Sequence, residues 1–452
     1  MPEIPTLQRP SGLGEVNEAA PKNETAPTRR RASSVVIRGF QLLLLIVGVV
    51  FTVVPIPGIA AGGHLDQTHI PAFLIALSIS WWLTPEIRSR AVRLKLVDQP
   101  GDPRRIHKVA VPRLGGVAIF IAIVTTLCAE MALCGRFPRE GGLAGIAAGG
   151  TLIFVLGLLD DLESIPAKVK LLVQVLAAWT AYTLGVRIDE YVGIPLPGVI
   201  VDFGPIHIHE YVRVGHLALP LTIMWLVGIT NAVNLIDGMD GLAAGVSAIS
   251  AVTIWSIAMA PGEGMLAHLH QPYPALIAAV LAGALCGFLR WNFNPARIFL
   301  GDSGAYLVGF VLASVAITAV IKKITLLSIA LPMLILFFPV ADTTWAIIRR
   351  TARGQSVFAP DAEHIHHRLL KKLKGSQKKT AYVIYGFSAI LGFFACSLVG
   401  QQWYYLSVGT AILAMALFFA EVLNRGRQRK GESAGPAPDE PPDLVPGESP
   451  AQ

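Results

Sequence analysis

The chain has 452 residues, of which 53% are hydrophobic and only 15% are charged, whereas about 25% of the residues of a typical soluble protein are charged. This composition excludes an ordinary soluble globular protein and indicates a polytopic membrane protein. The net charge of +7 is also found in nucleic-acid-binding proteins, but the distribution of Lys and Arg along the chain accounts for it without a nucleic-acid partner.

Apolar runs of about 17 to 22 residues, which are long enough to cross a bilayer, recur about twelve times. Their approximate centres are residues 45, 77, 124, 152, 177, 226, 250, 281, 311, 337, 390 and 412. We therefore predict an all-α polytopic membrane protein with about 11 to 12 transmembrane helices.

Three further segments surround the main transmembrane domain, which we place at residues 68–424. Residues 33–55 contain an apolar run after a long polar leader, and we expect an extra, uncleaved N-terminal anchor rather than a cleaved signal peptide. The two ends, 1–32 and 425–452, are rich in Pro, Gly, Ala and Glu and lack apolar periodicity. They are expected to be disordered cytoplasmic tails.

The positions of Lys and Arg predict the orientation in the membrane. With both termini in the cytoplasm, the two ends, Arg38 at the start of the anchor and the inward loops near 85–113, 160–170, 236–241, 290–303 and 349–380 hold 31 of the 37 Lys and Arg residues. The opposite side holds Arg136, Arg139, Arg187, Arg213, Lys322 and Lys323. This bias is typical of a multi-pass protein of the plasma (cell inner) membrane.

One outward loop, near 186–216, contains the alternating stretch "VIVDFGPIHIHEYVRVG". Such alternation predicts a small periplasmic β-hairpin. His207 and His209 fall on one strand face and are potential metal ligands, but an exposed hairpin is the favoured interpretation.

Polar residues gather in five motifs, and all five fall on the predicted cytoplasmic side. In chain order they are "LVDQPGDPRRIHKVAVPRLGG" (96–116), "GLLDDLESIPAKVKLL" (157–172), "TNAVNLIDGMDGLAAG" (230–245), "NFNPARIFLGDSG" (292–304) and "PDAEHIHHRLLKK" (360–372). Because burying polar groups in a bilayer costs free energy, such residues indicate a functional site by default.

Asp160 and Asp161 lie at the C-terminal end of the run centred at 152. The helix dipole disfavours an anion there by about 0.3 to 1 kcal/mol, so the pair suggests function. The alternative is that Asp161 begins a solvated turn or caps the following helix. Lys168 and Lys170 are close enough to supply opposite charge.

Asn234 and Asp237 are three residues apart and share a helix face, with Asp240 one turn further on. The alternative for this motif is a turn, because Asp-Gly is a favoured turn dipeptide. Asp302 lies between Gly301 and Gly304, where it is also placed to cap the next helix.

Carboxylate and amide oxygens on several loops of one face are suited to Mg²⁺, with Mn²⁺ as a substitute, because this ion shares its shell with substrate phosphates. The nearby lysines and arginines would hold those phosphates. Together these features predict phosphoryl transfer at the membrane surface.

His364, His366 and His367 lie in a long basic loop. Recognition of a phosphate or a sugar is the favoured interpretation. A zinc site and an amphipathic helix on the membrane surface, in which these histidines are incidental, are the alternatives.

The five motifs, in this order, resemble those of the polyprenyl-phosphate N-acetylhexosamine-1-phosphate transferases. The resemblance covers roughly residues 70–425 through "RRIHKVAVPRLGG", "GLLDD", "NAVNLIDGMDGLA", "FLGDSG" and "HIHH". It implies that a UDP-N-acetylhexosamine donates its sugar 1-phosphate to a membrane-embedded polyprenyl phosphate and that UMP is released.

The resemblance also implies roles for single residues. The ligands of the magnesium ion would be Asn234 and Asp302. Phe299 would stack on uracil, and the phosphate-binding cations would be Lys108, Arg113 and Lys170. Asp160 would be a base or nucleophile supported by Asp161, while Asp237 and Asp240 match acidic positions important for activity. The three histidines His364, His366 and His367 match the sugar-nucleotide recognition loop.

Two mechanisms stay open. An acceptor phosphate is largely ionised near pH 7, with a second pKa of about 6, so it can attack directly while Asp160 takes a residual proton. The other mechanism is double displacement through a phosphorylated Asp160. Direct attack is the favoured one.

The sequence favours the N-acetylglucosamine branch, as the first membrane step of cell-surface polysaccharide synthesis. "HIHH" and "PRLGG" differ from the three adjacent histidines and the threonine in place of Arg113 that are typical of phospho-N-acetylmuramoyl-pentapeptide transferases, which remain the alternative. A transporter or flippase, or a lipid-binding scaffold, is less favoured because the polar motifs cluster at one face and the halves do not repeat. A homodimer is left open.

Overall fold

The computed structural model describes residues 41–49, 68–98, 110–134, 142–188, four strands between 191 and 213, and residues 215–259, 271–320, 332–354 and 364–398. The predicted tails, the apolar run centred at 412 and Lys108 lie outside these residues.

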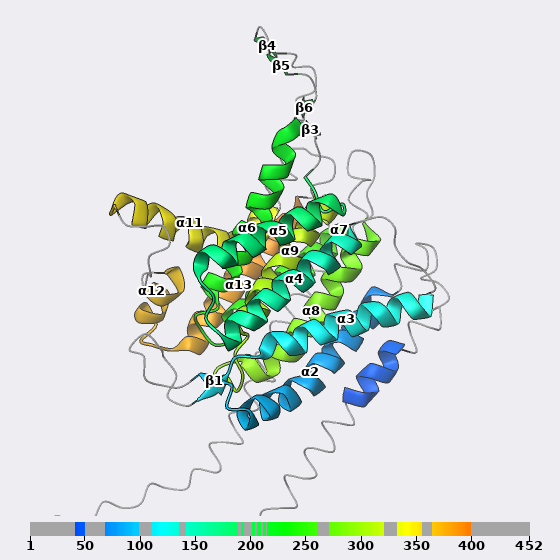
Figure 1. The fold of residues 1–452 in the computed structure, drawn as a ribbon, viewed down its shortest axis with the longest axis vertical. Helices are drawn as coiled ribbons and strands as arrows, with labels where there is room; N and C mark the ends of the chain where they lie inside the picture. Colours follow the sequence, from blue (N-terminus) through cyan, green and yellow to red (C-terminus); the bar gives the residue numbers. More distant parts are fainter. Residues whose placement is uncertain are drawn as a thin grey trace, which may run out of the picture. The chain divides into compact units, whose positions relative to one another are not determined.

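The described chain is mainly helical (Figure 1). Its helices are α2 (His69–Arg93), α3 (Gly115–Cys134), α4 (Leu143–Leu162), α5 (Ala167–Thr183), α6 (Ala218–Ile236), α7 (Leu242–Ala258), α8 (Pro272–Asn292), α9 (Gly301–Val320), α11 (Phe337–Ala352), α12 (Ile365–Lys372) and α13 (Gln377–Ser397), with the 3-10 turn η2 (Gly215–Leu217) before α6.

Seven helices of the described residues are long and apolar enough to cross a membrane: α2, α3, α4, η2 with α6, α8, α9 and α13. The multi-pass architecture is therefore confirmed, and seven of the about 11 to 12 predicted spans correspond to these helices of the described residues. The runs near 177 and 250 form α5 and α7, which have only 17 residues each. The run near 337 lies at the start of the 16-residue α11, and a helix covers 41–49 of the predicted anchor.

Helices α7, α8 and α9 form the interior of the bundle. The apolar windows of α8 and α9 are 89% and 94% buried, and nearly every residue of α7 is buried. Around them α2 packs on α8, α4 and α6 pack on α9, and α13 packs on α7. Each of these surrounding helices also exposes large apolar side chains, as expected for faces that contact lipid.

The strands are short and pair two by two. Strands β1 (Val97–Asp98) and β2 (Val111–Pro112) are antiparallel, with Val97 opposite Pro112. In the loop that alternates in sequence, β3 (Tyr191–Gly193) pairs with β6 (Tyr211–Arg213), and β4 (Val201–Phe203) pairs with β5 (Ile206–Ile208), both antiparallel.

The first turn of α9 packs closely between two glycines. A Cβ atom on Gly116 of α3 would lie 2.2 Å from the Gly304 nitrogen, and one on Gly157 of α4 would lie 2.5 Å from the Ser303 Cα. No side chain fits at such distances. Glycine at these two positions therefore lets α3 and α4 approach the end of α9 that carries Asp302.

The contact at Gly157 leads to a stability prediction. Gly157→Ala should lower the free energy of unfolding by about 1 to 3 kcal/mol, because its Cβ would lie 2.5 Å from the Ser303 Cα and overpacking forces backbone shifts. Gly150→Ala is the matched control on the same helix, since its Cβ would meet Leu307 at an ordinary 3.7 Å. Thermal unfolding in detergent measures both, and equal melting temperatures for the two variants would contradict the close approach.

Candidate active site

A carboxylate from α4 caps the N-terminus of α9. Asp161 Oδ1 accepts the Asp302 N–H at 2.8 Å, and its Oδ2 accepts the Ser303 N–H at 3.0 Å and the Ser303 hydroxyl at 2.6 Å. A helix begins with backbone N–H groups that have no partner inside the helix, and its N-terminus favours negative charge. Asp161 therefore fixes where α9 begins and how Asp302 is presented.

The local sequence explains this contact. Gly157 and Asp161 are four residues apart on α4, so the close approach and the cap lie on one helix face. Gly301 has φ of +74°, and a Cβ there would lie 1.9 Å from the Arg113 carbonyl oxygen and 2.7 Å from Asp161 Oδ2. Asp161 is thus a capping residue, as one alternative proposed, but it caps α9 rather than the following helix.

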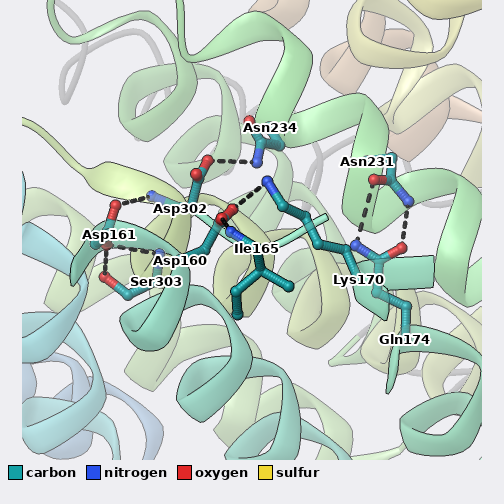
Figure 2. Close-up of polar contacts among 9 residues, drawn as sticks. All are labelled: Asp160, Asp161, Ile165, Lys170, Gln174, Asn231, Asn234, Asp302 and Ser303. Atoms are coloured by element: carbon teal, nitrogen blue, oxygen red, sulfur yellow. Dashed lines mark hydrogen bonds and ion pairs between the residues drawn. The ribbon is translucent and has the colours of Figure 1, made fainter. Parts of the chain in front are cut away.

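Asp160, the neighbour of Asp161, lies in a polar cluster with three other side chains (Figure 2). Its Oδ2 forms an ion pair with Lys170 of α5, and its Oδ1 accepts the Ile165 N–H at 2.9 Å. Its side chain is only 2% exposed. Lys170, which the sequence predicts to be a phosphate-binding cation, is paired with the Asp160 carboxylate in this structure.

Asp302 completes the cluster. Its Oδ1 accepts a hydrogen bond of 2.8 Å from Asn234 Nδ2 at the end of α6, and its carboxyl group points toward that of Asp160. Figure 2 shows the ends of Asp160, Lys170, Asn234 and Asp302 pointing toward one another from four helices. Three of the five sequence motifs therefore meet here.

The donor atoms of this cluster fit a hard cation. Two carboxylates that point toward one another repel, and a cation between them would relieve this repulsion. Among the residues that the structure describes, no group of three or more His, Cys, Asp or Glu side chains is arranged as a metal site. Two carboxylates leave positions for water and phosphate oxygens, which suits Mg²⁺, and Asn234 would add its amide oxygen by turning its amide group over.

Asp237 directly follows the last residue of α6 and lies next to this cluster. Its N–H donates to the Asn234 carbonyl oxygen at 3.0 Å. Burial, followed by repulsion from the Asp302 and Asp161 carboxylates, raises the pKa of Asp237 well above its usual value. Arg113 opposes this rise. Among the described residues of the site, acidic side chains therefore outnumber the basic side chains that could neutralise them.

Asp240 makes contacts of a different kind. Its Oδ2 accepts hydrogen bonds from Asn294 Nδ2 at 2.8 Å and from the Ala296 N–H at 3.0 Å. It therefore ties the turn after α6 to the loop that follows α8. These contacts position the loop, and they place Asp240 among the residues that shape the site.

The first motif joins the site through its backbone. The Phe299 N–H bonds to the Pro112 carbonyl at 2.8 Å, and the Gly115 and Gly116 N–H groups bond to the carbonyls of Phe299 and Leu300 at 3.0 and 2.9 Å. Half-buried Arg113 and Phe299 are thereby held beside the start of α9. Lys108 lies outside the described residues.

The three histidines also reach this region. His364 and His366 are buried, while His367 is half-buried. A Cβ on Gly238 would lie 3.1 Å from His366 Nε2 and 3.9 Å from His367 Nε2, so the last motif faces the turn that follows Asp237. Burial and the two neighbouring histidines lower the pKa of His367 to about 4, which leaves it neutral at pH 7.

Two polar residues of this region were not predicted. Asp342 of α11 is buried, and its carboxylate contacts Ile365, His364 and His366. Gln174 of α5 forms a reciprocal amide pair with Asn231 of α6, with distances of 2.7 and 3.3 Å. Both Asp342 and Gln174 lie in apolar stretches, where a polar side chain is itself the signal of a function.

Comparison with known proteins shows to which family the chain belongs. The model of glycosyl transferase family 4 matches residues 143–320, from the start of α4 to the end of α9. A probable undecaprenyl-phosphate N-acetylglucosaminyl 1-phosphate transferase of Bacillus subtilis is 35% identical over 355 residues, covering 78% of this chain and 90% of the relative. The chain belongs to glycosyl transferase family 4. It is a membrane transferase of that family, which confirms the resemblance found in the motifs.

Two further relatives differ in their described activities. A decaprenyl-phosphate N-acetylglucosaminephosphotransferase of Mycobacterium tuberculosis is 36% identical over 340 residues, covering 72% of this chain and 81% of the relative. A phospho-N-acetylmuramoyl-pentapeptide-transferase of Heliobacterium modesticaldum is 32% identical over 326 residues, covering 67% and 90%.

The cap on α9 predicts that Asp161 is needed for stability as well as activity. Asp161→Asn should lower the free energy of unfolding by about 1 to 2 kcal/mol, because an amide group cannot accept from both backbone N–H groups and the hydroxyl. Glu163→Ala, at an exposed position just after α4, is the control and should be neutral. Thermal unfolding decides, and an unchanged melting temperature for Asp161→Asn would rule out the cap.

Proposed function

We propose that this family 4 transferase moves an N-acetylhexosamine 1-phosphate, specifically N-acetylglucosamine 1-phosphate, from its UDP-sugar to undecaprenyl phosphate or a similar polyprenyl phosphate and releases UMP. The observation that carries the proposal is the convergence of Asp160, Lys170, Asn234 and Asp302 at the N-terminus of α9. The described activities of the N-acetylglucosamine relatives support the same reaction.

The reaction brings two anions together, the acceptor phosphate and the donor diphosphate. Asp302 and Asn234, with Asp160 beside them, would hold Mg²⁺, or Mn²⁺ in its place. When bound, this ion would neutralise charge on the donor diphosphate. The raised pKa of Asp237 agrees with a site that has an excess of carboxylates without such a cation.

In the favoured mechanism, an oxygen of the polyprenyl phosphate attacks the phosphorus that carries the sugar. A new diphosphate bond forms as the bond to UMP breaks. Asp160 takes a residual proton from the acceptor phosphate, and Lys170, its ion-pair partner, lies beside it. A phospho-sugar adduct trapped on Asp160 would instead establish double displacement.

The other motif residues take roles around this centre. Phe299 would stack on uracil, and Arg113 with Lys108 would bind phosphate oxygens. The sugar-nucleotide would also contact the three histidines His364, His366 and His367, which lie at the turn that follows Asp237. Asp161 and Asp240 would act by positioning Asp302 and the loop after α8, rather than by touching the reacting atoms.

The membrane orientation is also part of the proposal. The bias of Lys and Arg supports cytoplasmic ends, a cytoplasmic active site and a periplasmic loop containing β3 to β6. Residues 68–424 would form the transferase domain, with residues 33–55 as an additional anchor and the two tails in the cytoplasm. A homodimer remains compatible with this arrangement.

A phospho-N-acetylmuramoyl-pentapeptide transferase is the second candidate, because one relative has that activity. The two N-acetylglucosamine relatives described above, at 35% and 36% identity, support the first candidate. The "HIHH" and "PRLGG" motifs support it as well. The product would be the first lipid-linked sugar of a cell-surface polysaccharide.

A panel of labelled UDP-sugars tests the proposal. Purified protein with polyprenyl phosphate and Mg²⁺ should release UMP fastest with UDP-N-acetylglucosamine, and chelation should abolish the reaction. Asp302→Asn should lower kcat at least 100-fold, because it removes a charged ligand at the reacting centre. If none of the UDP-sugars led to UMP release, the function would be refuted. Full activity of Asp302→Asn would refute the role of Asp302 in holding the metal.

A further inference from the structure

The carboxylate of Asp342 organises the histidine motif. Its Oδ1 accepts the Ile365 N–H at 2.6 Å, which caps the first turn of α12, and its Oδ2 lies 3.2 Å from Nδ1 of both His364 and His366. Asp342 is 1% exposed. Although burial acts in the opposite direction, the two histidines and the Ile365 N–H hold the pKa of Asp342 well below its usual range.

The far nitrogen of His366 is buried and unsatisfied. His366 is 1% exposed, and its Nε2 has no hydrogen-bond partner among the described residues. A buried polar atom without a partner costs about 1 to 3 kcal/mol, so such an atom in a functional site indicates a ligand. The direction of Nε2 is known, because it faces Gly238 in the turn beside Asp237.

The hydrogen bond at Nδ1 determines what Nε2 can do. A carboxylate only accepts hydrogen bonds, so the Nδ1 of His366 must carry its proton toward Asp342. In the neutral ring, Nε2 then carries a lone pair. Even a Cβ atom at position 238 would lie only 3.1 Å from Nε2, so the glycine keeps a side chain from crowding this lone pair.

We propose that Asp342 is a positioning residue: it holds His366 by Nδ1, so that the Nε2 lone pair faces the turn at Gly238 and accepts a hydrogen bond from the donor substrate. The partner on the substrate is an O–H or N–H group of the sugar-nucleotide. The identification of the substrate as a sugar-nucleotide rests on the proposed function. The inferred tautomer of His366 rests only on its hydrogen bond to Asp342.

Asp342→Asn separates this role from a general effect on folding. The introduced amide retains the size of the carboxylate, but its NH₂ group would donate to Nδ1 and would place the histidine proton on Nε2. Two N–H groups would then face each other across the substrate contact. The KM for the UDP-sugar should rise on the order of 10- to 100-fold, whereas the KM for polyprenyl phosphate should stay within about twofold.

The tautomer can be observed directly. In protein labelled with ¹⁵N-histidine and reconstituted in membranes, the His366 signals, assigned by their loss in His366→Gln, should show protonated Nδ1 and unprotonated Nε2. Asp342→Asn should reverse them. Thr344→Ala, at an exposed position of the same helix, should keep both signals and both KM values.

Two results would overturn the proposal: unchanged His366 signals in Asp342→Asn, or a wild-type KM for the donor despite reversed signals. If Asp342→Asn does not fold, Gly238→Ala tests the same contact, because it crowds Nε2 and should raise the donor KM without changing the tautomer. An unchanged donor KM there would equally refute it. Absence of UMP release by the wild-type protein would refute the proposed function instead, and the tautomer measurement would still test the role of Asp342.

Discussion

The bond between the Asp161 carboxylate and the first turn of α9 is the constraint on which the rest of the site depends. It joins the C-terminal end of α4 to the N-terminal end of α9, and the glycines at 116 and 157 allow the backbones to come close enough. With α9 held there, Asp302 faces Asp160 and Asn234. A second carboxylate, Asp342, caps α12 from α11 in the same manner. In both places an acid from one helix sets the start of another helix that carries a functional residue.

This arrangement divides the acidic residues of the site by physical role. Asp160 and Asp302 meet at the centre where a cation and phosphates would bind, and repulsion from Asp302 contributes to the raised pKa of Asp237. Asp161, Asp240 and Asp342 accept backbone N–H groups of segments far away in the chain, and they position what surrounds that centre. Adjacent identical residues such as Asp160 and Asp161 can therefore differ completely in function, because successive side chains on a helix point in different directions.

The sequence predicted the membrane-spanning character and the group of motifs, because apolar length and clustered polar residues are local signals. Apolar composition alone did not show that α5, α7 and α11 have only 16 or 17 residues. The cap by Asp161, the Gln174–Asn231 pair and the contacts of Asp342 could not be predicted in this way. They join residues that are far apart in the chain, and only the packing of the helices brings them together. For Gln174 and Asp342, a polar residue within an apolar stretch was the available signal.

Cation binding by the Asp302 cluster tests the account most directly. Titration of the purified protein with Mn²⁺, followed by electron paramagnetic resonance, should show one bound ion per chain that Mg²⁺ displaces. Asp302→Asn should lose this binding while the protein stays folded, and Glu163→Ala should retain it. Wild-type affinity for Mn²⁺ in the Asp302→Asn variant would contradict the central claim that α9 presents Asp302 to a metal ion at the reacting centre.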